Sequence, residues 1–310
     1  MAEVLAKTLD MSRDEWLEAR REGIGGSDAA AICGLNKWRS PFEVWMEKTG
    51  QLKPKEAGEA AYWGTQLEDL VAREFMKRTG LKVQRRNAIL RHPKYHFMLA
   101  NLDRVIVGSN EGPGILECKT TSSYKAKEWE EDKVPMEYII QVQHYLAVTG
   151  YQYAYIAVLI GGNKFLYKRI ERDEELIKNL IAIESEFWTR VVTMEPPPPD
   201  GSAACTELLK EMYPEGEDSE IQLPSEAEKI IEQYDEAAEQ EKIWAERKAE
   251  AENKLKEMLK KNSKGYIGER TVSWTNVTSA RFDSKRFKQE NPDLYSKYQK
   301  ESSYRRFSVK

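Results

Sequence analysis

The feature that most constrains the fold is a pair of short apolar segments that also carry charges, within residues 101–120 (NLDRVIVGSNEGPGILECKT). Their composition is typical of strands, and the glycines between them predict a connecting loop. Asp103 lies on the first segment, whereas Glu117 and Lys119 lie on the second. Residues two apart on a strand point to the same face, so Glu117 and Lys119 project together. If the loop folds the two segments against each other, Asp103 reaches that same face.

The chemistry of these side chains points to metal-dependent hydrolysis. Two neighbouring carboxylates repel each other unless a divalent cation neutralises them. Carboxylate oxygens are ligands that Mg²⁺ prefers, and the ion keeps coordination sites for water and phosphate. A lysine beside the metal can hold or deprotonate the attacking water. An acid, a spacer and then Glu-x-Lys is the motif of the PD-(D/E)xK nucleases, although Leu102 stands where the nominal motif has proline.

Glu-x-Lys is a common pattern, so its surroundings must give it weight. If the Glu-x-Lys pattern is considered alone, a charged strand face that is solvated or ion-paired explains it better than a catalytic motif does. Glu68, on the helix predicted before the sheet, either completes a metal shell, directly or through water, or is a solvated helical acid. Gln141 and Tyr145 share one face of the helix predicted after the Glu-x-Lys strand. They either point at the catalytic edge or form a polar face with a half-buried tyrosine.

The order of the predicted elements defines the fold class. Residues 11–80 have helical periodicity, and Gly80 ends the last of these helices. From Leu81 the periodicity is mainly that of strands. The predicted strands are 82–90, 97–107, 114–120, 151–160 and 164–172, and the predicted helices between and after them are 136–150 and 171–192. We therefore expect an α/β core in which helices flank a mixed sheet.

A proline run, Pro196–Pro199, is the clearest domain boundary. Beyond it come an acidic loop and a long helical stretch from Ser225 to about Lys261. The apolar residues of this stretch keep only a rough helical spacing, which favours an exposed helix or helical hairpin over a coiled coil. We predict three parts: a core domain over 1–195, a proline-rich and acidic linker over 196–224, and a helical and β-rich appendage over 225–310.

Charge is distributed unevenly along the chain. Residues 1–194 hold 28 basic and 28 acidic residues, residues 195–260 hold 8 and 19, and residues 261–310 hold 12 and 5. The basic end therefore says more about nucleic acid than the net charge of −4 does.

The basic end also contains alternating segments. Residues 271–277 and 303–309 alternate as strands do, and we expect them to pair into a small sheet with a basic face. Its arginines, Arg305 and Arg306 foremost, either contact DNA phosphates or balance the acidic stretch.

Other features exclude several classes of protein. The three cysteines lie far apart without a Cys-x-x-Cys pair, which argues against a disulfide framework, a zinc ribbon or a cysteine-bound iron–sulfur cluster. No apolar run approaches the length of a membrane span, and the N-terminus does not have the pattern of a secretory signal. We expect a cytoplasmic protein. His92 and His96 flank a proline and fit a turn better than a zinc site, and we assign His144 no role.

Five blocks of sequence resemble, in this order, the YqaJ-type viral recombinase family, which is related to the phage lambda exonuclease. They are REGIGGSDAAAICGLNKWRSPFEVW, WGTQLED, LDRVI, GILECKTT and QVQHYLAVTG, within residues 12–194. The resemblance implies a restriction-endonuclease-like core that digests one strand of double-stranded DNA from its 5′ end. It also implies two Mg²⁺ ions per site, for which Mn²⁺ could substitute, a homotrimeric ring, and a single-strand annealing recombinase as partner in the host cytoplasm.

The resemblance also implies roles for individual residues. Asp103 and Glu117 would bind metal with help from Glu68 and the backbone carbonyl of Cys118. Lys119 would position the nucleophile. Gln141 would belong to the active-site face.

The N-terminal block suggests how a 5′ end is bound. Gly25-Gly26-Ser27 opens a predicted helix, where free N–H groups and a hydroxyl can bind an anion. Arg20 matches the arginine that grips the 5′-phosphate in the family, although the adjacent Arg21 leaves this assignment open. Ser27 would cap its helix in either case. We expect Asp28, which would repel a phosphate, to point away or to cap the helix.

Two other functions stay open. An endonuclease or RecB-like nuclease module would cut closed circular DNA, although the absence of a cysteine cluster disfavours the iron–sulfur branch of that group. A catalytically inert DNA-binding or recombination scaffold is disfavoured by the complete set of Asp103, Glu117 and Lys119.

Overall fold

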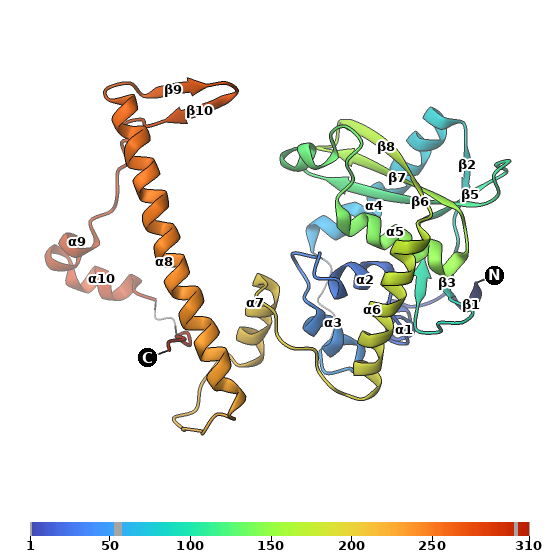
Figure 1. Ribbon diagram of the computed structural model, residues 1–310, viewed down its shortest axis with the longest axis horizontal. Coiled ribbons are helices and arrows are strands. Elements are labelled where there is room, and N and C mark those ends of the chain that lie inside the picture. Colours follow the sequence, from blue (N-terminus) through green and yellow to red (C-terminus); the bar gives the residue numbers. More distant parts are fainter. Residues whose placement is uncertain (1, 53–57, 301–302, 310) are drawn as a thin grey trace. The chain divides into compact units, whose positions relative to one another are not determined.

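The computed structural model describes residues 2–52, 58–300 and 303–309. The chain divides into two compact units, Met1–Met212 and Tyr213–Lys310 (Figure 1). The division falls inside the segment predicted as the linker. Among the described residues, no helix combines the length and the apolar character needed to cross a bilayer.

A mixed five-stranded sheet forms the centre of the first unit. The strand order is β2 (Lys82–Gln84), β5 (Arg104–Val107), β6 (Gly114–Thr121), β7 (Tyr153–Ile160) and β8 (Lys164–Glu171). Only β6 and β7 pair in parallel; the other neighbours are antiparallel. A parallel pair needs a crossover, and α5 (Met136–Thr149) lies in the connection between these two strands. The predicted mixed sheet is confirmed.

Helix α4 (Glu59–Thr79) covers one face of this sheet. Val71 and Phe75 of α4 are buried against Leu116 of β6 and Tyr153 of β7. The helix ends where Gly80 adopts a φ of 74°, a left-handed conformation that glycine adopts without strain.

Helix α5 covers the opposite face. Its Leu146 belongs to the same buried cluster as Ile115 of β6 and Ile156 of β7. Because side chains alternate along β6, Glu117 and Lys119 lie on the α5 side together with Ile115.

Four further helices complete the α5 side of the unit, as Figure 1 shows. They are α1 (Arg13–Arg21), α2 (Gly26–Ile32), α3 (Pro41–Lys48) and α6 (Glu174–Val192). Ser12 and Glu15 form the expected capping box at the start of α1. Helix α7 (Ala203–Met212) lies within the segment 196–224 and buries Cys205 and Leu208.

Two predicted strands are wrong as single elements. Residues 82–90 form β2 and then β3 (Ala88–Arg91), because 84–87 are four exposed polar residues that cannot continue a buried strand. Residues 97–107 likewise divide into β4 (Leu99–Asn101) and β5, with a bend at Asp103. Strands β3 and β4 pair in a separate sheet of order β1-β3-β4, where β1 spans Glu3–Lys7.

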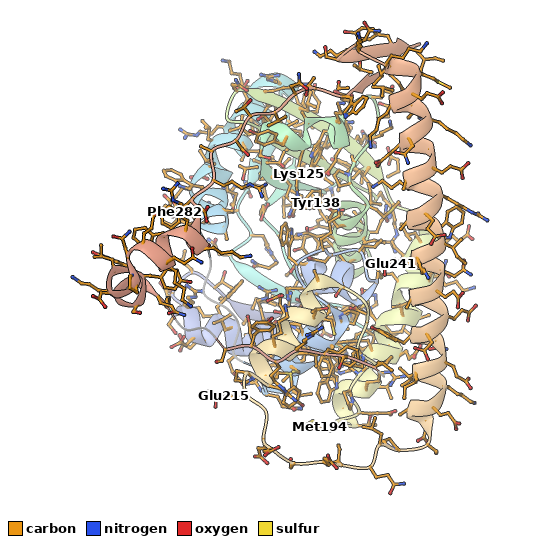
Figure 2. The ribbon with its side chains drawn as sticks, turned by 90° about the vertical axis from the view of Figure 1, so that its left-hand side faces the viewer. Lys125, Tyr138, Met194, Glu215, Glu241 and Phe282 are labelled. Atoms are coloured by element: carbon orange, nitrogen blue, oxygen red, sulfur yellow. The ribbon has the colours of Figure 1, made fainter. Side chains whose placement is uncertain are left out.

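The second unit contains the long helix α8 (Glu226–Leu259), as predicted. Figure 2 shows its side chains, including Glu241, and Leu259 is its one buried residue. A hairpin of β9 (Lys264–Ile267) and β10 (Arg270–Ser273) follows, then α9 (Ser284–Glu290) and α10 (Pro292–Tyr298).

The predicted strand at 303–309 is wrong, because these residues contain no strand. Phe307 instead places its ring against Tyr234 of α8, with centroids 5.9 Å apart. Strand β10 covers only the first part of 271–277 and pairs with β9, so the sheet between the two alternating segments does not form.

Candidate active site

The structure brings Asp103, Glu117 and Lys119 together at the sheet. Asp103 lies at the bend before β5, where its Oδ2 accepts a hydrogen bond of 2.8 Å from the backbone N–H of Cys118. Lys119 Nζ donates to Glu117 Oε1 at 2.7 Å. Asp103 and Glu117 line one cavity of about 220 Å³. The adjacency expected from strand periodicity is therefore present.

Gln141 links the lysine and the glutamate to α5. Its Oε1 accepts a hydrogen bond from Lys119 Nζ at 2.9 Å, and its Nε2 donates to Glu117 Oε1 at 2.8 Å. The same Nε2 lies 3.2 Å from the Tyr145 hydroxyl, to which it donates. Gln141 and Tyr145 thus point at the sheet edge that carries Glu117 and Lys119, which is the first of the two arrangements expected for this helix.

The electrostatics of the site reflect its burial. Burial and the neighbouring charge of Glu117 raise the pKa of Asp103 well above its usual range. Burial alone would lower the pKa of Lys119, but the carboxylates of Glu117 and Asp103 outweigh it and raise that pKa. Lys119 is therefore held as an ammonium ion. The two carboxyl groups favour a bound cation over two unneutralised negative charges.

The donor atoms fit a magnesium ion. Glu117 Oε2 is buried and has no hydrogen-bond partner among the described residues, whereas Oε1 accepts from Lys119 and Gln141. Leaving a buried charged oxygen unpaired is costly, so Oε2 is suited to a metal ligand. Asp103 supplies a second hard oxygen donor beside it in the same cavity. No group of three His, Cys, Asp or Glu side chains converges on one point within the described ranges.

Glu68 lies near Asp103 and Glu117, but its direct partner is an arginine. It forms an ion pair with the buried guanidinium of Arg104, which also pairs with Asp69. Arg104 Nη1 further donates to the carbonyl of Asp103 at 2.5 Å. Glu68 is therefore held beside the site by Arg104, and its charge contributes to the raised pKa of Asp103. Local sequence does not reveal the role of Arg104, because the contact depends on the approach of α4 to β5.

Arg20 and Ser27 line the same cavity as Asp103 and Glu117. Arg20 Nη2 donates to Ser27 Oγ at 3.4 Å, and its guanidinium lies 4.6 Å from the ring centroid of Trp16. A guanidinium, a hydroxyl and the start of α2 thus face the carboxylates across one cavity. Trp16 was not singled out from the sequence.

Arg21 has a different environment. Its Nη1 pairs with Glu18 at 2.9 Å on the exposed side of α1. It is absent from the lining of the cavity that holds Asp103 and Glu117, although it lines a neighbouring one. The geometry therefore favours Arg20 where the sequence left the two arginines open.

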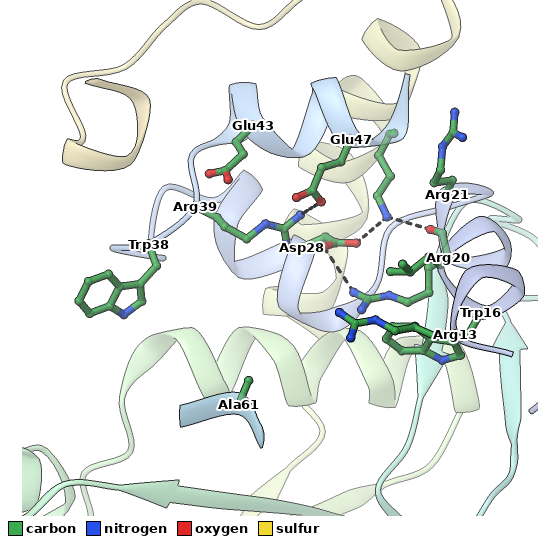
Figure 3. Close-up of a pocket in the computed structure, with 12 residues that line it drawn as sticks. Arg13, Trp16, Arg20, Arg21, Asp28, Trp38, Arg39, Glu43, Glu47 and Ala61 are labelled. Atoms are coloured by element: carbon green, nitrogen blue, oxygen red, sulfur yellow. Dashed lines mark hydrogen bonds and ion pairs between the residues drawn. The ribbon is translucent and has the colours of Figure 1, made fainter. Parts of the chain in front are cut away.

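Asp28 organises the helices around Arg20 (Figure 3). Its Oδ2 accepts from the backbone N–H of Gly25 at 3.0 Å, so it caps α2 as expected. It also pairs with Arg39 at 2.7 Å, with Lys48 at 2.7 Å and with Arg20 at 3.7 Å. These cations neutralise the acid close to a site that we expect to bind phosphate. Arg20 belongs to α1, Lys48 to α3 and Arg39 to the loop before α3, and local sequence does not show that these segments meet.

The histidines have structural contacts. Fully buried His144 bonds Glu184 through Nδ1 and the carbonyl of Leu99 through Nε2, both at 2.8 Å, which ties α5 to α6 and β4. His92 Nδ1 accepts from the backbone N–H groups of Lys94 and Tyr95 at 3.0 and 2.9 Å. The turn interpretation of this segment is confirmed.

Arg305 and Arg306 lie in the second unit and are both exposed. Arg305 Nη1 donates to the carbonyl of Tyr213 at 3.5 Å. Both arginines are therefore accessible from solvent, and Arg305 also makes a contact within the chain.

Fold and site together define a class of protein. A mixed sheet with helices on both faces, which has an acid at the bend before β5 and Glu-x-Lys on β6, is the fold of the PD-(D/E)xK nucleases. A family model described as the YqaJ-like viral recombinase domain matches residues 15–152. The "Uncharacterized protein YqaJ" of Bacillus subtilis (strain 168) is 52% identical over 100% of this chain and 98% of its own length. The chain belongs to the YqaJ family of viral recombinases.

Solved structures agree on the fold. LHK-Exo, an alkaline exonuclease from Laribacter hongkongensis, superposes with a TM-score of 0.50 over 64% of this chain and 97% of that chain. A crystal structure of LHK-Exo in complex with dAMP matches equally well. At 22% sequence identity, these similarities establish a shared architecture.

Proposed function

We propose that the protein is a Mg²⁺-dependent 5′→3′ exonuclease that degrades one strand of linear double-stranded DNA during phage-type recombination. Family membership and the nuclease fold support a nuclease role in recombination. The observation that carries the proposal is the shared cavity. Asp103 and Glu117 line one side of it, and Oε2 of Glu117 is buried there without a hydrogen-bond partner among the described residues. Arg20 and Ser27 line the other side.

Each residue has a chemical role in this proposal. Asp103 and Glu117 would hold the cation, with the Cys118 carbonyl and Glu68 as further ligands suggested by the family resemblance. A divalent cation supplies positive charge that polarises the scissile phosphate. Lys119, which is held as an ammonium ion, donates a hydrogen bond that orients the attacking water. Gln141 fixes Lys119 and Glu117 relative to each other.

The proposal includes the assembly that the family resemblance suggests. It comprises a homotrimeric ring that acts on duplex ends, a single-strand annealing recombinase as partner, and two Mg²⁺ ions, replaceable by Mn²⁺, in each site. Native mass spectrometry of the purified protein tests the ring. A mass of three chains is the expected result.

Digestion of linear and covalently closed circular duplexes separates the proposal from its rivals. We expect Mg²⁺ to support degradation of the linear duplex only, and EDTA or Ca²⁺ to prevent it. Cutting of the closed circle would indicate the endonuclease. Binding without degradation of either substrate would indicate the inert scaffold.

Arg20 is predicted to select 5′-phosphorylated ends. A guanidinium can bind a phosphate through two charge-assisted hydrogen bonds, and a terminal phosphate carries more charge than a diester. Each such bond is worth about 1.5–3 kcal/mol, or roughly tenfold to a hundredfold in rate. Wild-type protein should therefore digest a 5′-phosphoryl duplex faster than a 5′-hydroxyl duplex, and Arg20→Ala should narrow the difference.

Initial digestion rates on both substrates measure this effect, and Arg21→Ala is the matched control. The control should keep the wild-type preference. A preference lost in Arg21→Ala but kept in Arg20→Ala would assign the role to Arg21. Equal rates of the wild-type protein on the 5′-phosphoryl and 5′-hydroxyl duplexes would show that there is no 5′-phosphate pocket.

Arg305 and Arg306 are predicted to contact DNA phosphates. Reversing both to Glu should weaken duplex binding and reduce the slope of log affinity against log salt by about 2, because fewer counterions are released. Fluorescence anisotropy across a salt series measures the slope. A double reversal of Lys229 and Lys242 in α8 gives the same change in net charge and should leave the slope unchanged. An unchanged slope in the arginine variant would assign both residues to contacts within the protein.

A further inference from the structure

Lys119 makes a third contact that the proposed mechanism does not use. Its Nζ lies 4.8 Å from the ring centroid of Tyr138. Tyr138 is in the first turn of α5, three residues before Gln141, so both side chains project from one side of that helix. Lys119 therefore meets a carboxylate, an amide and an aromatic ring.

The tyrosine ring is itself held from behind. Trp129, only 1% exposed, stacks on it with centroids 5.5 Å apart and planes 26° apart. Trp129 ends the short helix η1 (Ser123–Trp129). This segment is fixed to β8 by Lys168, whose Nζ donates to the carbonyls of Trp129, Glu131 and Lys133 at 3.0, 2.5 and 2.6 Å. The Tyr138 ring therefore packs on Trp129, which is fixed to the same sheet that carries Lys119.

We propose that Tyr138 is a positioning residue for Lys119, and that the face of its ring holds the ammonium group in line with the reacting atoms. This inference rests on the proposed nuclease function. A lysine side chain has four flexible methylene groups, so two hydrogen bonds alone leave the ammonium free to swing. A cation is attracted to the negative face of an aromatic ring, and more strongly where water is excluded. The ring closes the side that Glu117 and Gln141 leave open.

The ring face, not the hydroxyl group, carries this role. Within the described parts of the chain, the Tyr138 hydroxyl has no hydrogen-bond partner. A phenylalanine would keep the ring, and a leucine, which is apolar but smaller, would remove the ring and its charge distribution. This gives a matched pair of substitutions.

Steady-state digestion of linear duplex by Tyr138→Phe and Tyr138→Leu, measured over a range of duplex concentrations, tests the inference. Tyr138→Phe should retain activity within about threefold, whereas Tyr138→Leu should lower kcat by about tenfold to thirtyfold with little change in KM. Tyr167→Leu is the control, because it removes a ring that packs on Phe75 at the α4 face of the sheet and should leave kcat near the wild-type value.

A second measurement separates positioning from packing. Phenylalanines with one, two and three fluorine atoms at position 138 keep the ring size but weaken its attraction for a cation. The logarithm of kcat should fall steadily along this series while the melting temperature stays constant. Equal kcat values across the series, or a Tyr138→Leu variant that digests as wild type, would overturn the role of Tyr138. Failure of the wild-type protein to digest DNA would instead overturn the proposed function.

Discussion

Replacing Lys119 with alanine is expected to abolish digestion of linear duplex DNA and to leave the fold and DNA binding intact. The ammonium group is the one cationic side chain that bonds both Glu117 and Gln141 among the described residues. Removing one preorganised hydrogen-bond donor from an active site costs about 10²–10³ in rate, so we expect a loss of about 10³-fold in the single-turnover rate. Asp103→Asn and Glu117→Gln should have effects at least as large, because they remove the negative charges that we propose bind the metal ion.

Lys164→Ala is the matched control for this experiment. Lys164 is an exposed lysine on β8 of the same sheet, and its removal should leave the rate unchanged. Circular dichroism should show the same helix and strand content for all variants. Digestion at the wild-type rate by Lys119→Ala would mean that this strand is not the catalytic one.

Replacing Asp28 with asparagine is expected to destabilise the first unit strongly. Asp28 is buried between Arg39 and Lys48, and its replacement removes the anion that pairs with Lys48 and one of the two that pair with Arg39, which keeps Glu47. Removing one partner of a buried pair costs about 3–5 kcal/mol. Urea denaturation at pH 7 measures the free energy of unfolding. Glu18→Gln, which breaks an exposed pair with Arg21, should cost no more than about 1 kcal/mol.

The effect of Asp28 should depend on pH. Burial alone would raise the pKa of Asp28, but the charges of Lys48, Arg39 and Arg20 outweigh it and hold that pKa well below its usual range. A depressed pKa contributes stability above the unfolded value of about 3.9, and this is lost as pH falls toward the folded value. The difference between wild type and Asp28→Asn should therefore shrink below about pH 4. A difference that is constant from pH 7 to pH 3 would contradict the ion-pair explanation.

Local sequence predicted the part of the site that lies on adjacent residues. The two-residue period of a strand placed Glu117 and Lys119 on one face, and the spacing of Gln141 and Tyr145 placed both on one helical face. The bend at Asp103 was not predicted, yet it lets the carboxylate reach the backbone of Cys118. A short apolar pattern cannot show where a strand leaves one sheet for another.

The missed contacts are all made between distant segments. Arg104 of β5 forms an ion pair with Glu68 of α4, and Arg39 of the loop before α3 forms one with Asp28 of α2. Such pairs depend on how helices pack, which neither periodicity nor charge counts reveal. The prediction of a strand at 303–309 was wrong for the same reason. Alternation indicates which side chains would share a face of a strand, but it does not show whether another strand lies alongside to pair with it.

The central claim is that this site removes nucleotides from 5′ ends in a metal-dependent reaction. The most direct measurement uses a linear 5′-phosphorylated duplex with different labels on the 5′-terminal and 3′-terminal nucleotides of each strand. We predict that Mg²⁺ causes release of the 5′ label first, as a mononucleotide, and that EDTA prevents release of either label. Release of the 3′ label first, or equal release with EDTA, would contradict the account.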